Sequence, residues 1–300
     1  MNAFKNAFKI LGNKFSFLWT HIAYYALAVF LIVSLCFSIL IPYINKIIES
    51  FDFIGRVSEM GQSILDNGGI DAFWTMFKQF FIDLGVVFAT GNYLSTMLLL
   101  LLGLILSRFI LGLAEVAFYH VIDMHLSSAT KQSFRMSFIK NIGKSCVFQL
   151  SKMLFTLPFD LAVLGLVYLA TLTFSVPLLL WFAPFLTLLV FVLMYSLRMT
   201  VFSGWIPQLL HSEKRRIFGS LFQSLSLLKE NKRFGRVYGA MLLYLLLIIA
   251  FNIFFGIFTL GVGLFITVPL SLYFMTVLNS TLYYQNSGLR YYIDAETIVN

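Results

Sequence analysis

The longest uncharged stretches of the sequence constrain the fold more than any other feature. Residues 161–197 and 237–289 contain 37 and 53 consecutive residues without Asp, Glu, Lys or Arg. A helix needs roughly 20 apolar residues to cross about 30 Å of hydrocarbon, so each stretch can hold most or all of two crossings. The mean hydropathy is +0.89, and 11% charged residues are too few to cover the surface of a soluble protein of this length. We therefore expect an integral membrane protein.

Glycine, proline and the remaining charge gaps divide the apolar sequence into six expected crossings. The long stretches break at "TFSVP" (173–177) and near "FGIFTLGVG" (255–263), where Gly and Pro are typical of turns. Every crossing should be helical, because lipid offers no partner to an unpaired backbone group. The expected fold is an all-α, polytopic helix bundle that forms a single transmembrane domain (1–300). Its six spans are 22–43, 93–117, 147–172, 177–199, 237–257 and 262–284.

The distribution of basic residues predicts the orientation. Segments 1–20, 120–152 and 198–236 carry three, five and eight basic residues with none, one and two acidic residues, whereas 44–90 carries three basic and six acidic. The positive-inside rule places the three basic segments and both termini in the cytoplasm of a multi-pass protein of the cell membrane. This bias and attraction to anionic lipid headgroups on the cytoplasmic face explain the net charge of +8. We therefore expect membrane lipids as partners, and no nucleic acid.

The opening segment predicts a helix that lies along the membrane surface. Phe4, Phe8, Leu11 and Phe15 share one helical face, opposite a polar face with Lys5, Lys9, Asn2, Asn6 and Asn13. Similar basic, amphipathic segments precede the second and third pairs of close spans. The expected cytoplasmic interfacial helices are therefore 1–20, 131–145 and 213–234. The recurrence indicates either three helical-hairpin repeats or the general tendency of cytoplasmic loops near lipid to become amphipathic and basic.

The extracytoplasmic connection 44–90 is expected to be a helical insertion. Apolar residues recur at nearly helical spacing on both sides of "DNGG" (66–69), which is typical of a turn between two amphipathic helices. The two helices either form a hydrophobic lid over the bundle or offer a binding surface for a substrate or a partner subunit.

Motifs of enzyme chemistry are missing from the sequence. It has no Gly-rich phosphate loop, no His-Glu-x-x-His and no nucleophile elbow. Its two cysteines and four histidines suggest neither a disulfide framework nor a metal site. We therefore expect no enzymatic activity, no cofactor, no metal and no catalytic residue.

Charged residues inside the expected spans are the best candidates for a functional site. A charge in hydrocarbon costs at least a few kcal/mol, so such groups usually pair or line a polar cavity. Lys152 and Arg198 are close enough to the cytoplasmic interface to reach it with extended side chains. The remaining charges form either a packing pair (Arg108 with Asp160 or with Glu115) or a polar site for a substrate headgroup or a proton. The candidate intramembrane polar site comprises Arg108, Glu115, Lys152, Asp160 and Arg198.

The pattern of the chain resembles that of poorly characterised bacterial six-span families. Basic amphipathic helices alternate with Phe-rich hairpins, as in the membrane domain fused to some glycerophosphodiester phosphodiesterases, and "FNIFFGIFTLGVGLFITVPLS" (251–271) is similar to the last hairpin of that domain. This resemblance implies a membrane location and a lipid-related role. The chain lacks a phosphodiesterase domain, so no catalytic residue carries over.

Three functions remain open from the sequence. The first is a non-enzymatic membrane protein that interacts with lipid or supports a complex. The second is a small transporter or permease subunit with a polar site near Arg108 and Asp160. The third is an intramembrane enzyme acting on lipid, for which the sequence offers no nucleophile–base pair or metal cluster.

Overall fold

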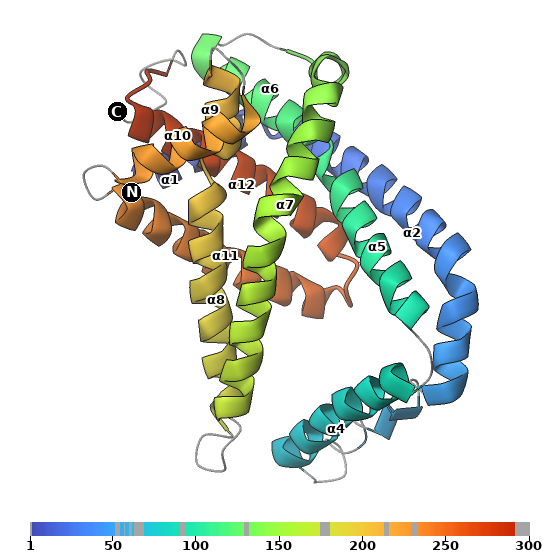
Figure 1. Cartoon of the computed structure of the whole chain (residues 1–300). Helices are drawn as coiled ribbons and strands as arrows, with labels where there is room; N and C mark the ends of the chain where they lie inside the picture. The colour runs from blue at the N-terminus through green and yellow to red at the C-terminus, as the bar shows by residue number, and fades with distance from the viewer. Residues whose placement is uncertain are drawn as a thin grey trace.

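The structure is a computed structural model that describes residues 2–51, 55–56, 58–59, 62, 69–90, 94–128, 132–174, 181–212, 216–229 and 233–291. All regular secondary structure in these residues is helical, which confirms the expected all-α class. The helices in Figure 1 are α1 (Asn2–Asn13), α2 (Ser16–Phe51), α4 (Gly69–Thr90), α5 (Leu94–Gly112), α6 (Glu115–Ser128), α7 (Phe134–Phe174), α8 (Ala183–Phe202), α9 (Trp205–His211), α10 (Ile217–Lys229), α11 (Arg233–Phe258) and α12 (Leu264–Ser287).

Six helical segments within the described part of the chain are long and apolar enough to cross a membrane. Each overlaps one of the six expected spans, so the chain is a multi-pass integral membrane protein. The break expected at 255–263 is present, with Leu260 and Gly261 at positive φ between α11 and α12. The break expected at 173–177 lies mostly outside the described residues. The six segments are Ser16–Leu35, Leu101–Ser128, Phe134–Phe174, Ala183–His211, Arg233–Phe258 and Leu264–Ser287.

Two helices run further than expected. Segment 131–145 was expected as a separate interfacial helix, but from Phe134 onward it forms the first turns of α7, which continues to Phe174. Pro158 lies inside α7 without ending it, as proline can in spanning helices whose neighbours satisfy the freed backbone groups. Likewise α2 continues to Phe51, so the insertion 44–90 begins as an extension of the first span. Its second expected helix is α4, and most of 52–68 lies outside the described residues.

Two of the long apolar segments are interrupted by short turns, one inside the expected span 93–117 and one just beyond the end of the expected span 177–199. A short turn at 113–114 separates α5 from α6, and another at 203–204 separates α8 from α9. A glycine lies at each interruption and lets another helix approach closely. A Cβ on Gly112 would lie 2.3 Å from Oε1 of Gln149, and a Cβ on Gly204 would lie 3.1 Å from Cβ of Ser224. The close approach of α7 and α10 therefore depends on these two glycines.

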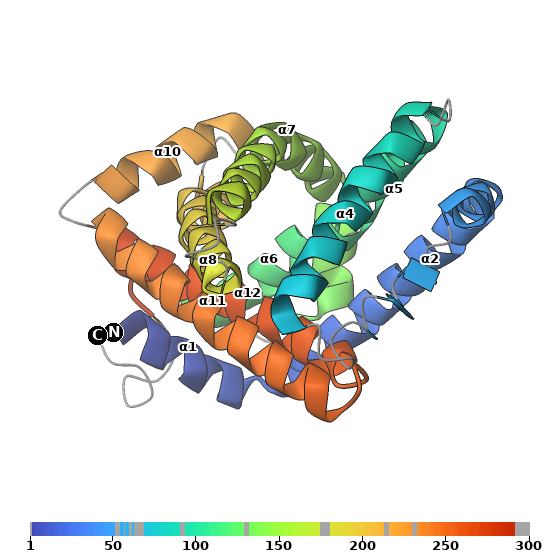
Figure 2. The same cartoon turned by 90° about the horizontal axis from the view of Figure 1, so that it is seen from below.

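The central helix of the bundle is α12. In the most apolar 18-residue stretch of α12, 61% of the residues are buried, against 17–22% in the corresponding stretches of the other five spans. It packs against α1, α2, α6 and α11. Figure 1 and Figure 2 show α7, α8 and α11 on one side and the pair α2 and α5 leaning away on the other, with α4 at the far end of that pair.

The helix α1 packs differently from the helical-wheel expectation. Its small residues Ala3 and Ala7 are buried, and its backbone accepts a hydrogen bond from α12, from Thr281 Oγ1 to the carbonyl oxygen of Ala3 at 3.3 Å. Asn6, expected on the solvated polar face, is therefore buried at 2% exposure. Phe8 remains half exposed, at 53%, although its ring also contacts Phe274 of α12, with the ring centres 4.7 Å apart. The expected apolar face is thus only partly exposed, because it also packs against α12.

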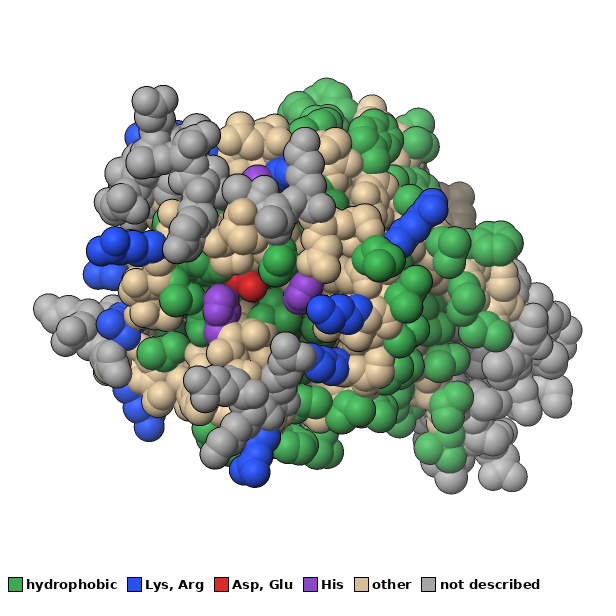
Figure 3. Space-filling model, turned by 90° about the horizontal axis from the view of Figure 1, so that it is seen from above, with side chains coloured by type: hydrophobic (Ala, Val, Ile, Leu, Met, Phe, Trp, Pro, Cys, Tyr) green, Lys and Arg blue, Asp and Glu red, His purple; other side chains and the backbone are tan. Residues whose placement is uncertain are grey.

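The basic segments gather at one end of the molecule. Helices α1, α9 and α10 lie together at the end opposite α4 (Figure 1). Viewed from above, this end carries Lys and Arg side chains around its edge and His and acidic side chains near its centre (Figure 3). The expected third interfacial segment, 213–234, contains α10, whose Phe218 and Phe222 are exposed at 48% and 63%.

Candidate functional site

A large cavity lies inside the spanning part of the bundle, between α2, α5, α6, α7, α8 and α12. Its volume is about 1210 Å³. Lining residues run from Ile22 to Val33 on α2 and from Leu264 to Thr276 on α12. With a rise of 1.5 Å per residue, the lining part of α12 alone is roughly 18 Å long.

The structure brings all five candidate residues to the wall of this cavity. They come from four helices, and the close approach of α7 to α5, α6 and α8 joins them into two ionic clusters. Arg108 lies on α5, Glu115 begins α6, Lys152 and Asp160 lie on α7, and Arg198 lies on α8.

The first cluster is an aspartate held by two arginines. Arg108 Nη1 lies 2.5 Å from Asp160 Oδ2, and Arg198 Nε contacts Asp160 Oδ1. A second nitrogen of Arg108 donates to Thr156 Oγ1 at 2.6 Å. The expected pair of Arg108 with Asp160 is therefore present. Arg198, which was expected to reach the cytoplasmic interface, instead turns into the bundle, because Asp160 on the neighbouring helix offers it a partner.

The second cluster joins Lys152 to Glu115. Lys152 Nζ lies 2.6 Å from Oε1 and 2.5 Å from Oε2 of Glu115. Gln149 Nε2 donates to Glu115 Oε2 at 2.9 Å and to the carbonyl oxygen of Gly112 at 2.6 Å. The expected escape of Lys152 to the interface and the alternative pair of Arg108 with Glu115 are therefore both wrong. The turn after Gly112 places Glu115 at the start of α6, where it faces α7.

Sequence reasoning missed Gln149 and Thr156, which complete the polar wall. A signal for them exists in the sequence, because polar residues recur along α7 at helical spacing and so share one face of that helix. Gln149 and Thr156 are both buried, at 2% and 0% exposure. The polar face of α7 comprises Ser137, Asn141, Ser145, Gln149, Lys152, Thr156 and Asp160.

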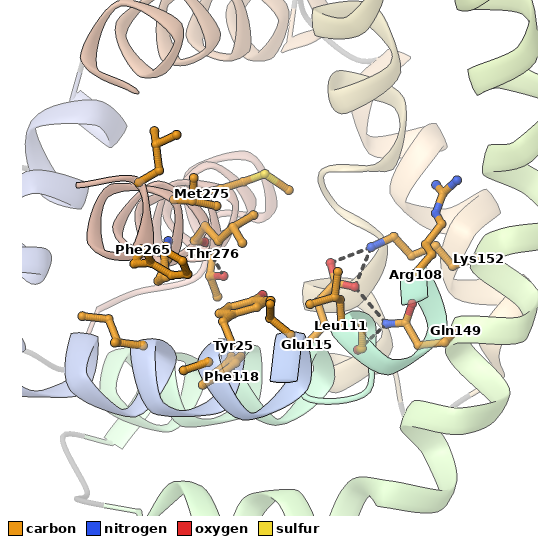
Figure 4. A pocket seen from close by; sticks show the side chains of 18 of the residues that line it. Tyr25, Arg108, Leu111, Glu115, Phe118, Gln149, Lys152, Phe265, Met275 and Thr276 are labelled. Carbon is orange, nitrogen blue, oxygen red and sulfur yellow. Dashed lines mark hydrogen bonds and ion pairs between the residues drawn. The ribbon is translucent and has the colours of Figure 1, made fainter. Parts of the chain in front are cut away.

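The cavity is amphipathic, with a charged wall opposite an apolar one. Figure 4 shows Glu115, Lys152 and Gln149 joined on one side and Phe265 and Met275 on the other. Among the described residues, three cations and two anions line the cavity, which gives this lining a formal charge of +1. Such a space can hold a molecule with a polar or anionic group at one end and an apolar body at the other.

A separate polar cluster lies at the basic end of the molecule. Asp123 Oδ1 accepts a hydrogen bond from the hydroxyl of Tyr284 at 2.7 Å and lies 2.8 Å from His211 Nε2. These contacts tie α6, α9 and α12 together. Within the described residues, no group of three or more His, Cys, Asp or Glu side chains is placed to hold a metal ion.

No protein-family model, curated protein or solved structure shows a significant match to the chain. The resemblance to the membrane domain of phosphodiesterase fusions therefore stays a prediction, and function is argued from the geometry of the cavity.

Proposed function

We propose that this chain is a non-enzymatic membrane protein that binds a membrane amphiphile in the cavity between α2 and α12. The observation that carries the proposal is the gathering of all five intramembrane charges on one wall of a large, otherwise mainly apolar space. We further propose that both termini are cytoplasmic and that the basic end of the molecule faces anionic headgroups.

A purely packing role accounts less well for this arrangement. Ion pairs that only fasten helices can be replaced by well-packed apolar groups at little or no cost in stability. Here the side chain of Arg108 is 34% exposed and that of Asp160 is 24% exposed, and both line the cavity. Charges in a spanning segment that open onto a cavity are typical of sites that meet a ligand.

Transport is the second candidate function, and one observation favours it. Asp160, a candidate site residue, lines the cavity rather than lying sealed between helices. A cavity that reaches this residue could admit a substrate or a proton as part of a small transporter or permease subunit. A protein partner would then supply the energy that moves the substrate across the membrane.

The proposal is tested by filling the cavity and measuring retained lipid. Val268→Trp adds bulk at a cavity-lining position on α12, whereas Val147→Trp adds the same bulk at an exposed position of α7 that does not line the cavity. We expect native mass spectrometry of detergent-purified protein to show lipid on the wild type and on Val147→Trp, and little on Val268→Trp. Equal retention by both variants, or none by the wild type, would contradict the proposal.

A further inference from the structure

We infer that the cavity's ligand is an amphiphile with one anionic group, bound by Arg108 and Arg198 on the cavity side of Asp160. The inference rests on the proposed function and names its ligand class. The shared chemistry is a carboxylate or a phosphodiester attached to an apolar chain, as in a fatty acid or an anionic phospholipid.

The charge balance of the two clusters locates the anion. Glu115 and Lys152 neutralise each other, with Lys152 Nζ within 2.6 Å of both carboxylate oxygens. The other cluster holds two guanidinium groups on one carboxylate and so keeps the whole surplus of +1. A lone charge in hydrocarbon is expensive, and no further carboxylate lines the cavity among the described residues. An incoming anion neutralises the arginine cluster.

The hydrogen-bonding capacity of the two arginines supports the same position. A guanidinium carries five N–H donors in a planar fork that matches carboxylate and phosphate oxygens. Arg108 directs one donor to Asp160 and one to Thr156, which leaves further N–H groups on a side chain that lines the cavity. The guanidinium carbon of Arg198 lies 5.1 Å from the ring centre of Tyr195, a cation–π contact that holds its orientation.

The apolar wall accommodates the chain but gives little selectivity. Lipid tails are as apolar as the side chains of α2 and α12, so moving a chain from bilayer to cavity gains little from the hydrophobic effect. Preference among amphiphiles therefore arises from the headgroup and its ionic contacts. This predicts discrimination by charge rather than by chain length.

The test is a binding comparison by native mass spectrometry and competition in detergent micelles. The probes are phosphatidylglycerol, palmitate, zwitterionic phosphatidylcholine and glycerol 3-phosphate, which has the anion without a chain. We expect phosphatidylglycerol or palmitate to bind at least tenfold more tightly than phosphatidylcholine, and glycerol 3-phosphate not to compete. Arg108→Gln should remove this preference, whereas Arg135→Gln, at an exposed position at the start of α7, should keep it.

A variant that binds the anionic lipid more tightly separates loss of the site from misfolding. Glu115→Gln leaves the charge of Lys152 unneutralised and raises the surplus in the cavity from +1 to +2, so binding of phosphatidylglycerol should tighten, which loss of structure cannot produce. If phosphatidylcholine binds as tightly as the anionic lipids and Val268→Trp blocks all of them, the inference fails while the proposed function stands. If Val268→Trp reduces the binding of none of the probes, both the inference and the proposed function fail. Competition by glycerol 3-phosphate would instead identify a site for small anions and would contradict the inference that the ligand is an amphiphile.

Discussion

The two arginines on one aspartate predict an unequal response to removing each partner. Arg108→Leu leaves Asp160 paired with Arg198 and removes two hydrogen bonds, one to Asp160 and one to Thr156; the bond to the charged carboxylate is worth about 1.5–3 kcal/mol. Asp160→Leu leaves two facing guanidinium groups without a counter-ion, so its cost should reach about 3–5 kcal/mol, as for a broken buried ion pair. The double variant leaves only Arg198 unpaired, and it should therefore be more stable than Asp160→Leu alone.

The assay is the free energy of unfolding from a reversible denaturant titration of the detergent-solubilised protein. The double-mutant cycle gives the coupling between Arg108 and Asp160, which we expect at about 1–3 kcal/mol for residues in direct contact. Arg135→Leu is the matched control, because an exposed surface position usually changes stability by less than about 0.5 kcal/mol. Additive effects, or equal losses for the two single variants, would refute the geometry of the cluster.

Three further predictions concern other parts of the chain. If the basic end is cytoplasmic, cysteine placed at Gln79 on α4 should react with impermeant reagents added from outside, and cysteine at Arg135 should not. The reverse pattern would show the opposite orientation in the membrane. A fluorescent probe at Phe8, which is 53% exposed on α1, should report an apolar environment in bilayers, and full exposure to water would exclude an interfacial helix. Hydrogen bonds from Arg56 and then Gln79 lower the pKa of Asp83 below its ordinary 3.8. The Arg56–Asp83 contact should therefore hold above pH 3.8 and be lost only as the pH falls through the lowered pKa, measured by spin-label distances between 55–62 and α4; loss at a higher pH would contradict the pairing.

The six crossings could be predicted because long gaps between charges leave few alternatives in a bilayer. The ends of helices could not be predicted as well. Whether Pro158 ends a helix depends on neighbours that satisfy its freed backbone groups, and α7 has α5, α6 and α8 against it. The turns after Gly112 and Phe202 depend on tertiary approach by α7 and α10, which hydropathy does not record.

The face of α1 illustrates what a helical wheel omits. The wheel separates phenylalanines from lysines correctly, but small residues such as Ala3 and Ala7 contribute little to an amphipathic pattern. They nonetheless form the surface that lets α12 approach, and Asn6 is buried with them. A neighbouring helix chooses its contact face by shape as well as by hydropathy, so this burial follows from tertiary packing.

The charged residues of the site could be found from the sequence, whereas their partners could not. A charge in a spanning segment is conspicuous, and all five candidates line one cavity. Which charges meet depends on where helices cross. Lys152 finds Glu115 only because the chain turns at 113–114, and Arg198 finds Asp160 only because α8 packs beside α7.

The spacing around the two arginines bears on the hypothesis of hairpin repeats. Arg108 and Arg198 each lie five residues before the turn that interrupts their crossing, so the second helices of the first two hairpins share one local plan. The third hairpin departs from it, because α12 runs without a turn from Leu264 to Ser287 and is buried at the centre. If the hairpins are repeats, this departure explains the asymmetry of the cavity. The first two units supply both arginines, and the third, with α2 of the first unit, supplies apolar lining.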